Sequence, residues 1–246
     1  MLILAAMLAA QIPTNSSVSA PPTSEAVVTN HRASALRLAQ LAYPKEALLI
    51  SQPTYVWDFA SSIVRTPQGA RIEQRYPSFA SRFAAAAQPL TAKHLYQRLP
   101  ELHRVAAEIY ASDLTDSEIA AMSAFLSSAA GRKFATEAQS RVRVATLIEG
   151  LASSEQTGET VANQARLAAV REAFANTSEV EKSEIGQFIV SPLGKKAIEV
   201  DSKIRPLATA WSEQSATAIE AQINQVTFRV MRQIAAEQAV RPRISR

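Results

Sequence analysis

A block of regularly spaced residues occurs twice in this chain of 246 residues. Each copy has a hydroxyl residue, a glutamate, a phenylalanine, a serine, a glycine and a lysine at the same spacing. The first copy is Thr115, Glu118, Phe125, Ser128, Gly131 and Lys133, and the second is Ser178, Glu181, Phe188, Ser191, Gly194 and Lys196. Every matched pair is separated by 63 positions. This constant offset indicates an internal duplication of a helical hairpin.

The start of each copy predicts the first turn of a helix. Thr115 and Ser178 each stand three positions before a glutamate and just before an apolar run. In this capping-box pattern the hydroxyl accepts a hydrogen bond from a free backbone amide, and the glutamate accepts one from the cap residue. A second helix should begin at Ser191, because Pro192 fits the first helical turn, and at Ser128 by analogy.

Glycine recurs at the start of each predicted second helix. Gly131 and Gly194 come three positions after the caps, and Gly69 follows Thr66 in the same way, as in a degenerate third copy. A glycine within a helix costs about 1 kcal/mol relative to alanine. We therefore expect a close approach of two helices at each corner to require it.

A basic residue follows each of these glycines by two positions. Lys133, Lys196 and Arg71 stand there, although a cation near a helix N-terminus opposes the helix dipole. Two interpretations of the lysines remain open. They are solvated surface charges, which is the simpler one, or they bind an acidic partner.

Helical periodicity dominates the rest of the chain. The longest apolar stripe consists of Ile219, Ile223, Val226, Val230 and Ile234, and no segment alternates long enough to predict a strand. The predicted fold class is an all-α helical bundle with the internal duplication. Pro206 should kink or restart the helix that carries Trp211, and both Trp211 and Trp57 are expected in the core or lining a groove.

The predicted organisation is one helical domain at residues 31–240. Its two related halves are about 31–150 and 160–240, and the glycine-containing stretch 149–160 is the predicted linker between them. A flexible leader at 21–30 should precede the domain. A basic tail at 241–246 follows it.

The N-terminus predicts a secretory signal peptide at residues 1–20. An apolar run occupies residues 2–10, although no lysine or arginine precedes Arg32. The run is too short for the roughly 20 residues of a transmembrane helix, so we expect no transmembrane span. The predicted location is the periplasm, with cleavage after Ala20 or, alternatively, after Ala10.

We predict no catalytic residues, no cofactor and no metal site. Cysteine is absent, which excludes zinc-thiolate sites and disulfides. His31 falls near the leader, and His94 and His103 stand too far apart in sequence to suggest a ligand set. No serine-hydrolase motif occurs, and no pair of carboxylates has a spacing that singles it out. The chain is therefore not expected to be an enzyme.

The charge favours an acidic partner. The formal net charge is +4 with an isoelectric point near 9.5, and Arg241, Arg243 and Arg246 lie at the C-terminus. Without a dense basic stripe interleaved with aromatic residues, nucleic acid is not expected. Anionic lipid or an anionic envelope polymer fits an exported protein better.

The first block resembles a family of exported bacterial proteins, domain of unknown function 2059. The similarity rests on the pattern Leu114-Thr115-x-x-Glu118-Ile119, then Phe125, then Ser128-x-x-Gly131-x-Lys133-Phe134. The preceding stretch, from Arg75-Tyr76-Pro77 through Leu99-Pro100-Glu101-Leu102 and Tyr110, also resembles members of the family, so the similarity covers most of residues 31–240. Ala129 stands where proline is usual in the family, and Leu126 where a second aromatic residue is common. The resemblance implies a small helical protein of the Gram-negative envelope, and it carries over no functional residues.

Two hypotheses about function follow. The first is a non-catalytic structural or interaction module of the cell envelope, acting through a protein partner or through self-association. It is favoured because each recurrent residue has a capping or packing explanation. The alternative is a carrier for an amphipathic or anionic small molecule or lipid, motivated by Lys133, Lys196 and the basic balance.

Overall fold

The structure is a computed structural model that describes residues 25–140, 174–175 and 177–240. Helices account for nearly all of this part, and no strand occurs in it, so the predicted all-α class is confirmed. The predicted signal peptide, the 149–160 linker and the basic tail lie outside the described residues.

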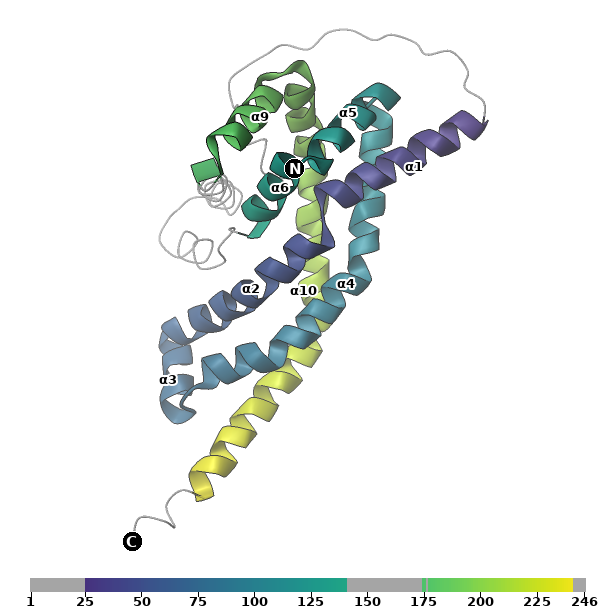
Figure 1. Cartoon of the computed structure of the whole chain (residues 1–246). Coiled ribbons are helices and arrows are strands. Elements are labelled where there is room, and N and C mark those ends of the chain that lie inside the picture. The colour runs from purple at the N-terminus through teal and green to yellow at the C-terminus, as the bar shows by residue number, and fades with distance from the viewer. Residues whose placement is uncertain (1–24, 141–173, 176, 241–246) are drawn as a thin grey trace.

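Two long helices run along the molecule side by side, and the shorter helices pack against them (Figure 1). Around one end of the long pair lie α1, α5, α6 and α9, whereas α2 and α3 extend along the other end. The described helices are α1 (Glu25–Ala42), α2 (Lys45–Arg65), α3 (Pro67–Arg75), α4 (Phe79–Asp113), α5 (Asp116–Ser127), α6 (Ala129–Ser140), α9 (Glu179–Val190) and α10 (Pro192–Val240).

The first described helix starts earlier than the sequence suggested. α1 begins at Glu25, so residues 25–30, which we expected in a flexible leader, are helical. His31 is consequently a helix residue whose side chain is held in place, as described below. Pro44 separates α1 from α2 and has the extended backbone of a helix cap, because a proline there cannot continue the preceding helix.

The last described helix passes through Pro206 without a break. Of the two predicted effects of Pro206, a kink or a restart of the helix, the restart was therefore wrong. A proline removes one backbone hydrogen bond and crowds the preceding turn. Here Ile204 and Ala208 are buried on either side of it in the same core, so packing against neighbouring helices stabilises the helix across the proline.

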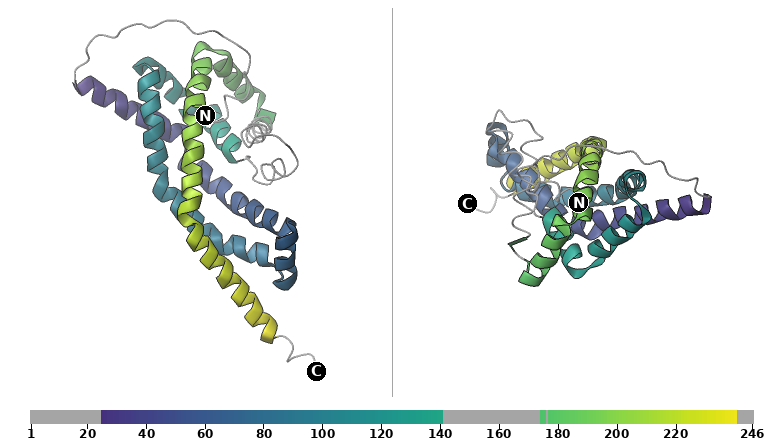
Figure 2. Two further views of the ribbon diagram at one scale, coloured as in Figure 1. Left: turned by 180° about the vertical axis from the view of Figure 1, so that it is seen from behind. Right: turned by 90° about the horizontal axis from the view of Figure 1, so that it is seen from above.

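The buried residues form two hydrophobic cores. We call the part around the first core the body; it comprises α1, α5, α6, α9 and residues 93–113 and 192–215. The second core lies in what we call the arm, which comprises α2, α3 and residues 79–92 and 216–240 (Figure 2). The arm core consists of Val56, Ala60, Phe79, Ala80, Phe83, Ala84, Ala87, Val226, Val230 and Ile234.

Candidate functional site

Both repeated blocks begin with the predicted capping box. Thr115 Oγ1 accepts a hydrogen bond from the Glu118 amide at 3.3 Å, and Glu118 Oε2 accepts one from the Thr115 amide at 2.8 Å. The same two bonds join Ser178 and Glu181, again at 3.3 and 2.8 Å. These hydroxyls therefore determine where α5 and α9 begin.

The second helix of each block also begins at the predicted serine. The hydroxyl of Ser128 accepts a hydrogen bond from the amide of Gly131 at 3.0 Å. Ser191 accepts one from the amide of Gly194 at the same distance. Each block is thus a helix, a one-residue corner and a second helix.

Close backbone approach accounts for the glycines at these corners. A Cβ atom on Gly131 would lie 2.0 Å from the carbonyl oxygen of Phe125, and one on Gly194 would lie 2.0 Å from that of Phe188. A Cβ atom on Gly69 would likewise lie 1.8 Å from the carbonyl oxygen of Ile63. Because the neighbouring atoms are backbone, no rotamer change can relieve the overlap. The packing interpretation of these glycines is confirmed.

The two blocks pack against each other through equivalent residues. The rings of Phe125 and Phe188 stack with centroids 3.8 Å apart and planes inclined by 1°. Lys133 donates to Glu181 Oε2 at 2.9 Å, and Lys196 donates to Glu118 Oε1 at 2.7 Å. Exchanging the two blocks maps each contact onto its counterpart, so their arrangement is approximately two-fold symmetric.

Each lysine thus binds the capping glutamate of the other block. Lys133 and Lys196 are therefore not simply solvated surface charges. The acidic groups that they bind belong to this chain rather than to an external partner. Sequence reasoning missed these ion pairs, although the shared offset of the lysines and glutamates was the signal that could have found them.

Hydrogen bonding keeps both glutamates ionised. Lys133 lowers the pKa of Glu181 from its ordinary value of 4.5 to about 2, and the amide and hydroxyl of Ser178 add to this effect. Burial alone would raise the pKa of Glu118, but hydrogen bonds from Lys196 and Thr115 outweigh it, so that pKa is also lowered. Each carboxylate accepts hydrogen bonds from the cap residue of its own helix and from the lysine of the other block. It thereby links the start of its helix to the opposite block.

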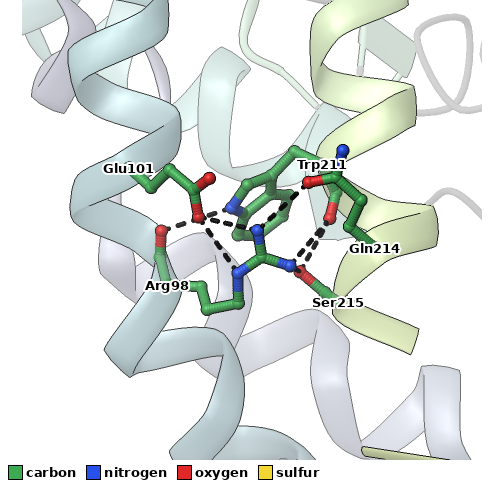
Figure 3. A network of polar contacts seen from close by, with 5 residues as sticks. All are labelled: Arg98, Glu101, Trp211, Gln214 and Ser215. Atoms are coloured by element: carbon green, nitrogen blue, oxygen red, sulfur yellow. Dashed lines mark hydrogen bonds and ion pairs between the residues drawn. The ribbon is translucent and has the colours of Figure 1, made fainter. Parts of the chain in front are cut away.

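A second polar network joins the two long helices (Figure 3). Arg98 of α4 donates to Glu101 at 2.7 Å and to Ser215 of α10 at 2.9 Å. The indole of Trp211 donates to the Arg98 carbonyl oxygen at 3.2 Å and packs partly buried against the body core, as expected. Trp57 is 47% exposed, so it does not lie in the core, which was one of the two places predicted for it.

The histidines have structural partners. In α4, buried His103 has Nε2 2.9 Å from the Tyr43 carbonyl oxygen. His31 lies between α4 and α5, with Nδ1 2.5 Å from Asp116 Oδ1 and Nε2 2.9 Å from the Ala111 carbonyl oxygen. Both of these oxygens are acceptors, so the two contacts are both hydrogen bonds when both ring nitrogens carry a proton. The bond to Asp116, and then that to Ala111, raise the pKa of His31.

The described residues contain no group of three or more histidine, aspartate or glutamate side chains that could hold a metal ion. Within the same ranges, no helix is both long and apolar enough to cross a membrane.

Two surfaces of the arm expose apolar side chains. On α2 the exposed side chains are Ile50, Tyr55, Trp57 and Phe59. On α10 an open hollow is lined by Gln225, Phe228, Arg229 and Arg232. A second open hollow lies on α9 between Glu179 and Gln187. Neither hollow includes Trp211, beside which the sequence suggested looking for an apolar ligand.

Comparison with known proteins gives one match. No curated protein and no solved structure matches this chain. A family model described as an uncharacterized protein conserved in bacteria (DUF2059) matches residues 100–147. This segment holds the end of α4, the first capping box and the first corner. The resemblance read from the first block is thereby confirmed: over residues 100–147 this chain is similar to that family of uncharacterized bacterial proteins.

Proposed function

We propose that this protein is an exported, non-catalytic helical module of the bacterial cell envelope that acts through contacts with a protein or a surface. The proposal rests on the structural roles of the residues that recur in the two blocks. Each of them caps a helix, permits a close corner or joins one block to the other. Their side chains are committed to holding the fold.

The proposed export rests on the N-terminal sequence. Residues 2–10 form the apolar run of a signal peptide, and a polar stretch that ends in small residues follows. The proposed location is therefore the periplasm.

The structure removes the main argument for the alternative that the protein carries a small molecule or lipid. This alternative required Lys133 and Lys196 to be available to an anionic ligand, whereas both ammonium groups bind glutamates within the chain. We therefore do not favour it. Native mass spectrometry of protein isolated from the periplasm, showing a stoichiometric small molecule or lipid, would restore it.

Cell fractionation with N-terminal sequencing tests the proposed location. The chain with a C-terminal tag is expressed in a Gram-negative host. We expect periplasmic protein whose N-terminus lies near Gln11 or Pro21. The double substitution Leu4→Arg with Leu8→Arg places charges in the apolar run, and it should leave an uncleaved protein in the cytoplasm. Uncleaved cytoplasmic wild-type protein would contradict the proposal.

A further inference from the structure

The C-terminal half of α10 has two different faces. Ile223, Val226, Val230 and Ile234 pack into or against the arm core. At 3.6 residues per turn, Phe228 projects from the opposite side of the helix. It is 61% exposed, more than Tyr55, Trp57 or Phe59 on α2. A large aromatic ring on this outer face is not explained by the packing of the arm.

Two arginines accompany the exposed ring. Arg229 and Arg232 line the open hollow with Phe228 and Gln225, and neither guanidinium has an ion-pair or hydrogen-bond partner among the residues that the structure describes. Arg82 of the arm, in contrast, binds both carboxylate oxygens of Glu237, at 2.6 and 2.8 Å. The outer face therefore presents unneutralised positive charge.

No acidic residue in this stretch of α10 offsets the charge. Residues 221–236 contain no aspartate or glutamate, and Glu237 is taken by Arg82. In the sequence, three further arginines follow α10 at positions 241, 243 and 246. From position 228 to the C-terminus the chain thus has five arginines besides one glutamate that is already paired.

We propose that this outer face of α10, formed by Gln225, Phe228, Arg229 and Arg232, binds the surface of an anionic phospholipid bilayer. Guanidinium groups bind phosphate oxygens in a bidentate manner. An aromatic ring beside them enters the boundary between headgroups and acyl chains. The residues lie along one helix rather than around an enclosed cavity, which suits an extended flat surface better than a small soluble anion.

This inference rests on the proposed envelope role and names the partner surface for it. The envelope role and the lipid-binding surface can be tested separately. Vesicle binding is measured with purified protein, whereas the location of the protein is measured in cells. A periplasmic protein that binds no vesicles would keep the envelope role and lose this surface.

Vesicle sedimentation tests the proposal. The purified full chain is mixed with vesicles of phosphatidylglycerol and phosphatidylcholine, or of phosphatidylcholine alone, at low and high salt. We expect binding to the anionic vesicles only, weakened by salt. The double substitution Arg229→Gln with Arg232→Gln should weaken binding about tenfold to thirtyfold, as expected for two basic residues at a membrane surface. Phe228→Ser should weaken it as well.

A control with the same change in net charge isolates the surface. Arg32 and Arg37 are exposed on α1, in the body, and the double substitution Arg32→Gln with Arg37→Gln should leave binding within about twofold of wild type. Circular dichroism shows that each variant is folded. Equal loss in both double variants, equal binding to neutral vesicles, or no binding by the wild type would overturn the proposal.

Discussion

Gly131 and Gly194 differ from Gly186 in what a side chain would meet. At the two corner glycines a Cβ atom would lie 2.0 Å from a backbone oxygen, whereas at Gly186 nothing lies within 4 Å. We expect Gly131→Ala and Gly194→Ala each to lower the free energy of unfolding by about 1–3 kcal/mol. Gly186→Ala, the control inside α9, should raise it by up to about 1 kcal/mol. Urea denaturation measures all three, and equal effects would refute the close-corner explanation.

Glu181 should make stability depend on acid pH. The unfolded carboxyl group titrates near 4.5 and the folded one near 2, so the unfolded state binds more protons between these values. The free energy of unfolding therefore falls as the pH drops through this window. Lys133→Gln removes the first cause of the shift and should raise the pKa of Glu181, which a carboxyl NMR titration would show. An unchanged pKa would mean that the ion pair does not form.

His31 should have the opposite dependence on pH. Its folded pKa is raised above 6.5 by Asp116 and Ala111, so its contribution to stability is complete below about pH 6.5. This contribution is lost as the pH rises through the folded pKa. Urea denaturation between about pH 5.5 and 8.5 should show this loss in the wild type and not in His31→Gln. The same profile for both proteins would exclude the charged bridge between α1, α4 and α5.

At the scale of single helices, the starts were predictable because their determinants are local. A capping box lies within one turn, so Thr115 with Glu118 defines the start of α5 without reference to the rest of the chain. The continuity of α10 through Pro206 was not predictable in this way. It depends on tertiary packing of the residues on either side, which a local pattern does not contain. The contacts of His31 were also not predictable, because its partners Ala111 and Asp116 are far from it in the sequence.

The caps give a test of these helix starts. Thr115→Ala and Ser178→Ala should each lower the free energy of unfolding by about 1 kcal/mol, because each leaves an amide of the first turn without its acceptor. Ser183 is exposed within α9, where its hydroxyl accepts only from the Gln187 side chain, so Ser183→Ala is a control with a smaller expected effect. Chemical denaturation measures the three variants. If Ser183→Ala lowers the free energy of unfolding as much as Thr115→Ala and Ser178→Ala do, the hydroxyls of Thr115 and Ser178 do not act as caps.

At the scale of the whole molecule, the sequence predicted a helical bundle but not its division into body and arm. The predicted halves do not correspond to these parts. Residues of α2 and α4 from the first half share the arm core with Val226, Val230 and Ile234 of α10 from the second half. Two long helices that each pass through both cores produce this sharing. Pairing between distant segments is a tertiary property, and spacing along the chain shows only that the blocks are alike.

The central claim is that the recurrent residues hold the two blocks to each other, and the stacked rings of Phe125 and Phe188 test it most directly. A double-mutant cycle of Phe125→Ala and Phe188→Ala, followed by urea denaturation, measures their coupling. We predict a coupling energy of about 0.5–1.5 kcal/mol, whereas Phe125 with Phe79 of the arm core should be additive within about 0.5 kcal/mol. Additive effects for Phe125 and Phe188 would contradict the pairing of the blocks. They would also make a ligand-binding role for the recurrent residues the better explanation.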